Sequence, residues 1–285
     1  DIYAPIFNEY KRFHNQQEGL APIDFDFYSL RNLDSDSLAR NLFHLVKGIY
    51  RMQMVDIKSS NFDKRKQEIS FLIYHYTETE NLNQAIKILT NKKRKVSCHF
   101  IIDIDGLIYN LVDTKERAWH AGDSMWGKFT DINSRSIGIE IVYPGEVFGV
   151  TYSPKQISSL IKLSSFLKKK FKICNKNILG HSDIAPHRKI DPGIFFPWKK
   201  LGDNSLGLWA NDKFDNSRLS KTEYNTFLKN LKKIGYPYIK LDQTFASNKF
   251  IIDSFHRHHL PKMVKLEPNK SSLNKSKDLL ILKNR

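Results

Sequence analysis

One polar segment holds most of the residues that could do chemistry. Residues 180–193 read Gly-His-Ser-Asp-Ile-Ala-Pro-His-Arg-Lys-Ile-Asp-Pro-Gly and lie between apolar segments. Two prolines and two glycines predict a loop with a defined path, and functional side chains are common on such loops beside a rigid sheet. His181 and Asp191 could supply two ligands of a zinc ion, which prefers imidazole and carboxylate donors in a tetrahedron.

Two further candidates lie inside apolar segments that are predicted to be strands. His75 lies within 70–76, a nearly continuous apolar run, and is the obvious third metal ligand. Glu140 lies within 136–142, where a carboxylate is costly unless it is paired or points into a site. Each residue also has an ordinary explanation. His75 could be a hydrogen-bonded core residue, Asp191 a turn former, and Glu140 could face solvent on an open side of the sheet.

The elements around these candidates alternate between strands and helices, which predicts a sheet with helices packed on it. Besides the two strands, we expect a helix over 81–90, strands over 98–104 and 107–112 joined at Asp105-Gly106, and a helix that begins at Ser153-Pro154. The predicted fold class is therefore α/β, with a mixed central sheet flanked by helices over residues 55–210.

A small all-α region is expected to follow. Ser220-Lys-Thr-Glu223 is a capping box that opens a helix ended by Gly235, and a second helix is expected from Ser247 to Pro261. Residues 262–285 contain seven basic and two acidic residues and are rich in Asn and Ser, which predicts a flexible tail. The predicted parts are an N-terminal extension of unknown role (1–54), a catalytic domain (55–210), a helical domain (211–262) and a basic tail (263–285).

Charge and composition narrow the classes of partner. The chain of 285 residues has 46 Lys and Arg against 30 Asp and Glu, a net charge of +16, which favours an acidic partner such as nucleic acid, anionic lipid or a bacterial wall polymer. Two cysteines exclude a disulfide scaffold and a Cys-rich zinc module. No run of 18 apolar residues exists, so we expect no transmembrane helix. The chain begins at Asp1 without Met, so a missing signal peptide does not indicate a cytosolic protein.

Five motifs in order carry a family resemblance over about residues 55–210. They are Ile73-Tyr-His-Tyr-Thr77, Val96-Ser-Cys-His-Phe100, Ala118-Trp-His-Ala-Gly122, Asn133-Ser-Arg-Ser-Ile-Gly-Ile-Glu140 and Gly180 to Gly193, followed by Phe196-Pro-Trp198. In these the sequence resembles the zinc-dependent N-acetylmuramoyl-L-alanine amidases of the second amidase class, most closely their AmiD-type periplasmic members. Family members often have Asn soon after the catalytic glutamate, whereas Ile141-Val-Tyr-Pro144 follows here. This departure concerns the shape of one wall of the substrate groove and not the chemistry.

The resemblance implies a role for each candidate. His75, His181 and Asp191 align with the zinc ligands, Glu140 with the catalytic glutamate, and Lys189 with a basic residue that assists the transition state. We expect three further residues of the motifs to line the substrate site or to be structural: His99, Trp119 and His120.

The implied reaction is hydrolysis of the amide between the lactyl group of N-acetylmuramic acid and L-alanine in peptidoglycan or muropeptides. The helical region resembles a peptidoglycan-binding domain through Lys232–Pro237 and Ser254–Pro261. The resemblance implies a bacterial enzyme of cell-wall degradation or recycling, in the periplasm or associated with the cell envelope. Secretion and a cytoplasmic location stay open. We expect a monomer that binds no nucleic acid.

Two other functions fit parts of the sequence. A non-catalytic peptidoglycan recognition protein would share the fold, but such relatives typically lose a metal ligand, and all three are present here. Nucleic-acid binding would use the basic charge, but only the basic tail supports it. The run His256-Arg-His-His259 looks metal-binding, yet cationic residues also suit the end of a helix.

Overall fold

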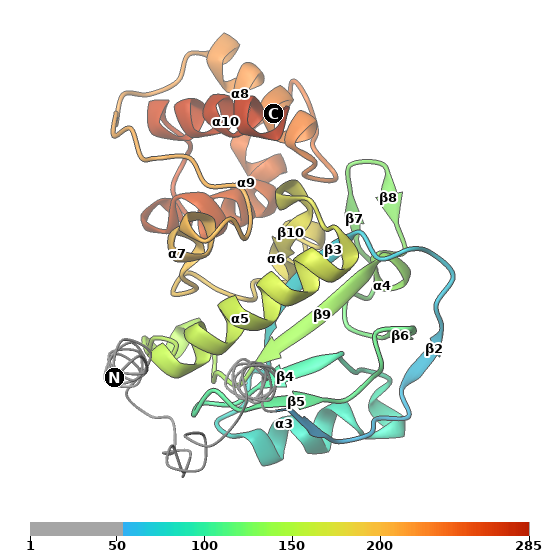
Figure 1. The fold of residues 1–285 in the computed structure, drawn as a ribbon. Coiled ribbons are helices and arrows are strands. Elements are labelled where there is room, and N and C mark those ends of the chain that lie inside the picture. The colour runs from blue at the N-terminus through green and yellow to red at the C-terminus, as the bar shows by residue number, and fades with distance from the viewer. Residues whose placement is uncertain (1–53, 285) are drawn as a thin grey trace, which may run out of the picture. The chain divides into compact units, whose positions relative to one another are not determined.

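A six-stranded mixed sheet lies at the centre of the computed structural model, which describes residues 54–284 (Figure 1). The strand order is β1-β5-β4-β9-β3-β10. The strands are β1 (Met54–Asp56), β3 (Phe71–Tyr76), β4 (Phe100–Ile102), β5 (Ile108–Asn110), β9 (Ser136–Ile141) and β10 (Ile178–Gly180). β4 and β5 pair antiparallel, and the other neighbours pair parallel. The predicted mixed sheet is confirmed.

The two central strands explain why the candidate residues sit among apolar ones. Every residue of β3 is buried, as expected for a parallel strand covered on both faces. Because side chains alternate along a strand, Phe71, Ile73 and His75 share one face. The register pairs His75 with Glu140 of β9, so these two side chains are neighbours on that face.

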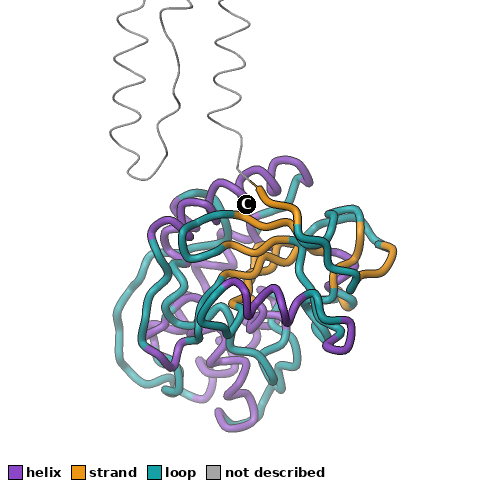
Figure 2. The backbone as a smooth tube through the Cα atoms, turned by 90° about the horizontal axis from the view of Figure 1, so that it is seen from below, coloured by secondary structure: helices purple, strands orange, loops and turns teal. Residues whose placement is uncertain are grey.

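Helices cover both sides of this sheet (Figure 2). The long helix α5 (Pro154–Phe171) packs Leu160 and Leu163 against the opposite face of β3 and β9. It begins at the predicted place, because Ser153 and Gln156 form a capping box. α3 (Leu82–Leu89) covers β4 from the other side, through Ala85 and Leu89.

Short elements complete the part of the molecule around the sheet. β2 (Phe62–Lys64) pairs with β6 (Glu116–Ala118), and β7 (Met125–Trp126) pairs with β8 (Phe129–Thr130). The short helices are α4 (Ile132–Arg135), α6 (His181–Ile184) and α7 (Trp198–Asp203). Single 3₁₀ turns lie at Lys92–Arg94, Glu146–Phe148, Asn175–Asn177 and Pro261–Met263.

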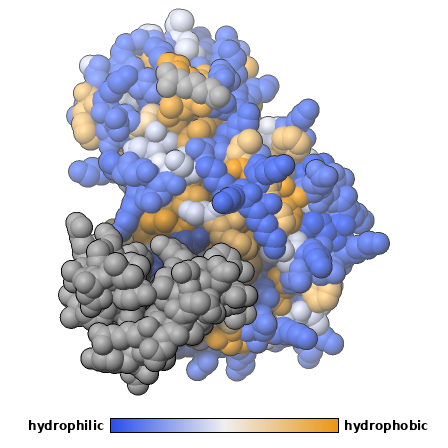
Figure 3. All heavy atoms as spheres, viewed as in Figure 1, coloured by the Kyte–Doolittle hydropathy of each residue, from blue (hydrophilic) through white to orange (hydrophobic). Residues whose placement is uncertain are grey.

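Three longer helices form the helical region: α8 (Lys221–Ile234), α9 (Phe245–His259) and α10 (Lys270–Lys283). α8 has the predicted capping box at Ser220 and ends at Gly235, whose φ of 137° suits glycine. α9 begins after Thr244, three residues before the predicted cap. In Figure 3 the visible surface of this region is largely hydrophilic, in keeping with the basic composition.

The prediction of a flexible tail over 263–285 is wrong for residues 270–283. These residues form α10, which packs along α8 and buries Leu273 and Leu279. Lys275 is buried as well, since its Nζ donates to the carbonyl oxygen of Ala210 and pairs with Asp212. Composition alone predicts that such a lysine is solvated. In the structure its charge is paired with residues that are far away in the sequence.

The helical region shares a core with the sheet. One apolar cluster runs from Phe71 and Ile73 of β3 to Phe227 of α8 and Phe255 of α9. Residues 54–284 accordingly lie in one compact unit, and the domain boundaries at 210 and 262 stay predictions. The predicted extension 1–54 lies outside the described residues except for Met54. No helix within residues 54–284 is long and apolar enough to span a membrane.

Candidate active site

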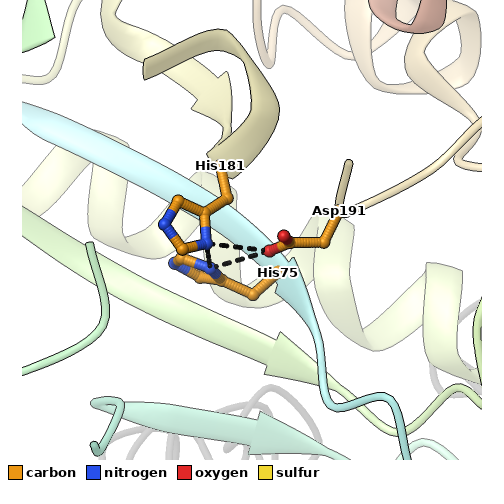
Figure 4. Close-up of side chains that lie close together, drawn as sticks. All are labelled: His75, His181 and Asp191. Atoms are coloured by element: carbon orange, nitrogen blue, oxygen red, sulfur yellow. Dashed lines mark hydrogen bonds and ion pairs between the residues drawn. The ribbon is translucent and has the colours of Figure 1, made fainter. Parts of the chain in front are cut away.

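Three side chains converge at the ends of two neighbouring parallel strands (Figure 4). His75 is near the end of β3, His181 directly follows β10, and Asp191 lies on the loop beyond α6. Their ligand atoms form a tight triangle. His75 Nδ1 lies 3.0 Å from His181 Nδ1 and 3.1 Å from Asp191 Oδ2, and His181 Nδ1 lies 3.0 Å from Asp191 Oδ2. All three residues are buried. Donor atoms around tetrahedral zinc lie roughly 3.3 Å apart, so the triangle has the size of a metal site.

Hydrogen bonds behind His75 determine which of its nitrogens carries a proton. Ser136 Oγ lies 2.6 Å from the carbonyl oxygen of Ile132, which can only accept, so the hydroxyl donates there and accepts from His120 Nε2 at 3.0 Å. His120 Nδ1 then accepts from His75 Nε2 at 3.0 Å. His75 Nδ1 therefore presents a lone pair to the triangle.

His181 has the same arrangement. Its Nε2 lies 3.2 Å from the carbonyl oxygen of Ala121, which can only accept, so Nε2 carries a proton, and Nδ1 presents a lone pair when the ring has no second proton. Two imidazole lone pairs and a carboxylate oxygen thus face one another at about 3 Å. Such an arrangement is repulsive unless a proton or a metal ion lies between the three atoms, so the residues fit a metal ion.

The electrostatics favour the protonation states that metal ligands need. Burial lowers the pKa of His75 to about 4, with a further contribution from His181, so this ring is neutral at pH 7. Burial opposes ionisation of Asp191, but His181 and His75 hold the pKa of its carboxyl well below the usual range. The neutral ring of His75 and the ionised carboxylate of Asp191 are the forms in which these residues bind a metal ion.

Glu140 faces the same cavity, a space of about 300 Å³ that His75, Asp191 and Lys189 also line. Its Oε2 is buried and has no hydrogen-bond partner among the described residues. Burial raises the pKa of Glu140 well above its usual value, the charge of Asp191 adds to the rise, and Lys189 opposes it. A carboxyl with a raised pKa in a polar cavity is suited to take and return a proton.

The structure places the three predicted substrate-site residues differently. Trp119 lines the cavity, and its Nε1–H donates to Asp63. His120 also lines the cavity, but its ring nitrogens are engaged behind His75. His99 is not among the described residues that line the cavity. It is fully buried, and its Nδ1 accepts the backbone N–H of Gly138. Substrate contact by these residues stays a prediction.

Sequence reasoning missed two small residues that make room for His120. A Cβ added to Gly138 would lie 2.4 Å from the His120 ring, so only glycine leaves space there. Ser136 anchors the same ring. Ser136, Gly138 and Glu140 share one face of β9 at a period of two, a signal that could have found them. Among residues 54–284 the run 256–259 is not part of a cluster that could hold a metal ion, and His256 bonds to Ser272 and His258 to Asp183.

A mixed sheet with two imidazoles and a carboxylate at its strand ends, beside a buried glutamate, is an arrangement that could bind a metal ion and carry out hydrolysis. Comparisons with known proteins specify the class. Residues 65–194 match the family described as N-acetylmuramoyl-L-alanine amidase. The chain is 33% identical over 235 residues to the N-acetylmuramoyl-L-alanine amidase AmiD of Escherichia coli, covering 74% of this chain and 84% of that protein. The chain belongs to the family of N-acetylmuramoyl-L-alanine amidases.

Other relatives agree with this assignment. The 1,6-anhydro-N-acetylmuramyl-L-alanine amidase AmpD of Haemophilus influenzae is 34% identical over 164 residues, which cover 50% of this chain and 88% of that protein. The solved complex of E. coli AmiD with the substrate anhydro-N-acetylmuramic acid-L-Ala-D-γ-Glu-L-Lys has a TM-score of 0.67 at 29% identity and covers 76% of this chain and 93% of that one. AmpDh3 of Pseudomonas aeruginosa, in complex with anhydromuramic pentapeptide, has a TM-score of 0.65 at 27% identity and covers 76% and 93%.

Proposed function

We propose that the protein is a zinc-dependent amidase that cleaves the bond between the lactyl group of N-acetylmuramic acid and L-alanine. The observation that carries the proposal is the triangle of His75, His181 and Asp191 beside Glu140. The relatives named for this reaction, and the AmiD and AmpDh3 complexes with muropeptides, support the choice of substrate.

His75, His181 and Asp191 would hold the zinc ion, which supplies a Lewis acid for attack on a poor electrophile. Glu140 takes the proton from the attacking water and passes it to the leaving amine of L-alanine. The raised pKa of Glu140 suits the first step, because a carboxyl of ordinary acidity would accept a proton less readily.

Lys189 is the candidate for stabilising the negative charge that develops on the amide oxygen. It lines the same cavity as Glu140 and the three metal-ligating residues. One well-placed donor of this kind contributes about 3 kcal/mol to the transition state. Lys189 also stabilises the ionised form of Glu140, as its opposing influence on the pKa of that residue indicates.

The substrate belongs to the bacterial cell envelope, and we propose that the protein works there, as a monomer. The net charge of +16 favours association with a polymer that carries stem-peptide carboxylates. Trp119, half-buried at the cavity wall, offers an apolar surface for a sugar or peptide. A binding-only protein would need neither Glu140 nor a complete ligand set.

The test is a digest of purified peptidoglycan and of an anhydro-muramoyl tripeptide, analysed by mass spectrometry. We expect release of free stem peptides that begin with L-alanine, loss of this activity after dialysis against a chelator, and its return on adding zinc. Full activity in the metal-free protein would disprove the proposal, as would tight muropeptide binding without cleavage at any zinc concentration.

A further inference from the structure

We propose that the helical region positions the metal ligands, through two adjacent residues of α9 that hold the two arms of the metal loop. The metal loop is defined here as residues 180–194, which carry His181 and Asp191. The two α9 residues are Arg257 and His258. This inference rests on the proposed zinc site and assigns the helical region a role besides any binding of the wall.

His258 holds the arm that carries His181. Its Nδ1–H donates to Asp183 Oδ2 at 2.7 Å. Asp183 lies two residues after the proposed zinc ligand His181. The same carboxylate accepts the backbone N–H of Gly180 at 2.8 Å and the hydroxyl of Tyr236 at 2.8 Å. Asp183 has no exposed surface and His258 only 4%, so water does not compete for these bonds.

The backbone of this arm is held as well. Ser254 of α9 donates its hydroxyl to the carbonyl oxygen of Ser182 at 2.7 Å. His181 begins α6, a helix of four residues, which is too short to be stable by itself. Contacts from Tyr236, Ser254 and His258 of the helical region therefore supply order that the local sequence lacks.

Arg257 holds the other arm through an intermediary. Its guanidinium makes two bonds to Glu146, Nε to Oε2 at 3.1 Å and Nη2 to Oε1 at 3.0 Å. Glu146 Oε2 also accepts the backbone N–H of Ile194 at 2.9 Å, three residues after the ligand Asp191. The side chains of Arg257 and Glu146 are 8% and 13% exposed, so removing one partner leaves a largely buried charge unpaired.

Packing fixes the position of His258. Its ring stacks between Trp198, at a centroid distance of 3.6 Å, and His259, at 3.9 Å. Trp198 begins α7, shortly after the metal loop, so the stack joins the helical region to the part of the chain that carries the site. Groups that orient metal ligands typically change metal affinity by about 10–100-fold when they are mutated.

The test compares zinc affinity, measured at pH 7 by competition with a chelating dye, in variants that separate the two features of His258. His258→Phe keeps a stacked ring but removes the donor to Asp183, and we expect zinc affinity to fall about tenfold or more. His258→Asn keeps a donor near the position of Nδ1 and should recover part of the loss. Arg257→Lys keeps the charge but loses the two-bond geometry, and should weaken zinc binding severalfold.

The matched control is His256→Phe. His256 is a fully buried histidine of the same helix, but it bonds to Ser272 of α10 rather than to the metal loop. This variant should lose stability without losing zinc affinity. The absorption spectrum of the cobalt-substituted protein gives a second readout, which should change in His258→Phe and stay unchanged in His256→Phe.

The outcomes separate this inference from the proposed function. A wild-type protein that binds no zinc would refute the proposed zinc site itself. Zinc affinity and a cobalt spectrum in His258→Phe equal to those of the wild type would overturn the positioning role alone, above all if sedimentation with peptidoglycan falls instead. Should His258→Phe fail to fold, Tyr236→Phe removes a single hydroxyl from Asp183 and is expected to weaken zinc binding severalfold; unchanged affinity there would equally overturn it.

Discussion

His75 and Glu140 stand on neighbouring strands of the sheet, whereas His181 and Asp191 stand on a segment that contains only four helical residues. The first pair, the sheet half of the site, is positioned by backbone pairing and by cores on both faces of β3. The second pair, the loop half, is positioned by side chains from the distant helix α9, where Ser254 and His258 bond to residues 72 and 75 positions earlier in the sequence. Local folding therefore accounts for one half of the site, and distant packing for the other.

The two halves of the site should respond differently to mutation. In the sheet half, the reactive group and its support can be changed separately, because the backbone is fixed by strand pairing. In the loop half, a change of one buried support moves the ligand itself. Separate measurements of kcat, zinc affinity and the free energy of unfolding distinguish loss of chemistry, loss of ligand positioning and loss of stability.

The largest effect is expected for Glu140→Gln in the sheet half. The amide cannot take a proton from water, so kcat should fall about 10²–10⁴-fold, while zinc affinity stays near the wild-type value. The measurement is steady-state hydrolysis of a muramoyl peptide together with zinc titration. Glu78→Gln is the matched control, since Glu78 lines the same cavity but is exposed. A kcat within threefold of wild type would exclude Glu140 as the proton carrier.

Gly138→Ala tests the support of the sheet half. The new Cβ would lie 2.4 Å from the His120 ring, so the ring must move and its bond to His75 must break. We expect a loss of about 1–3 kcal/mol in the free energy of unfolding and a fall of about 10–100-fold in zinc affinity. Urea denaturation and dye competition measure the two. Unchanged zinc affinity would show that strand pairing alone positions His75.

The residues of the sheet half also show how much of the site the sequence alone can predict. Glu140 and His75 could be singled out as candidates because a polar residue within an apolar strand stands out in the sequence, whereas their proposed roles came from the family resemblance. The period of two along β9 could have marked Gly138 as a residue on the site face, but the need for glycine comes from His120, which approaches from another part of the chain.

The helical region was harder to predict for the same physical reason. His258 reads as a helix-end residue, but its function depends on Asp183, 75 positions away. α10 reads as a flexible tail, because its few apolar residues and its lysines predict solvation. Lys275 is buried nonetheless, with its Nζ over Trp209 at 4.6 Å. Such pairs are visible only after the chain has folded.

A pH experiment tests whether α9 also governs stability away from the metal. Burial lowers the pKa of His256 to about 4, against about 6.5 in the unfolded chain. The unfolded state therefore binds more protons than the folded state between these values. The stability that depends on a neutral, buried His256 is present above pH 6.5 and is lost as the pH falls towards 4. At pH 5 the loss should be about 2 kcal/mol relative to pH 7.

The variant that isolates this contribution is His256→Gln, whose amide can still bond to Ser272. Urea denaturation at pH 7 and pH 5 should show a smaller loss in the variant than in the wild type, by up to about 2 kcal/mol. Equal losses in the two proteins would mean that His256 does not titrate between these pH values and is not a source of the acid sensitivity.

The smallest effect is expected at Trp119, which belongs to the cavity wall and supports neither half of the site. Trp119→Leu removes an aromatic surface worth about 0.5–1.5 kcal/mol, so KM should rise about 2–10-fold with kcat and zinc affinity nearly unchanged. Phe62→Leu is the control, because Phe62 is an exposed aromatic of neighbouring β2 and is not among the described residues that line the cavity. A change in zinc affinity with Trp119→Leu would contradict the separation of the cavity wall from the residues that position the metal ligands. The cavity wall would then be part of the support for His75.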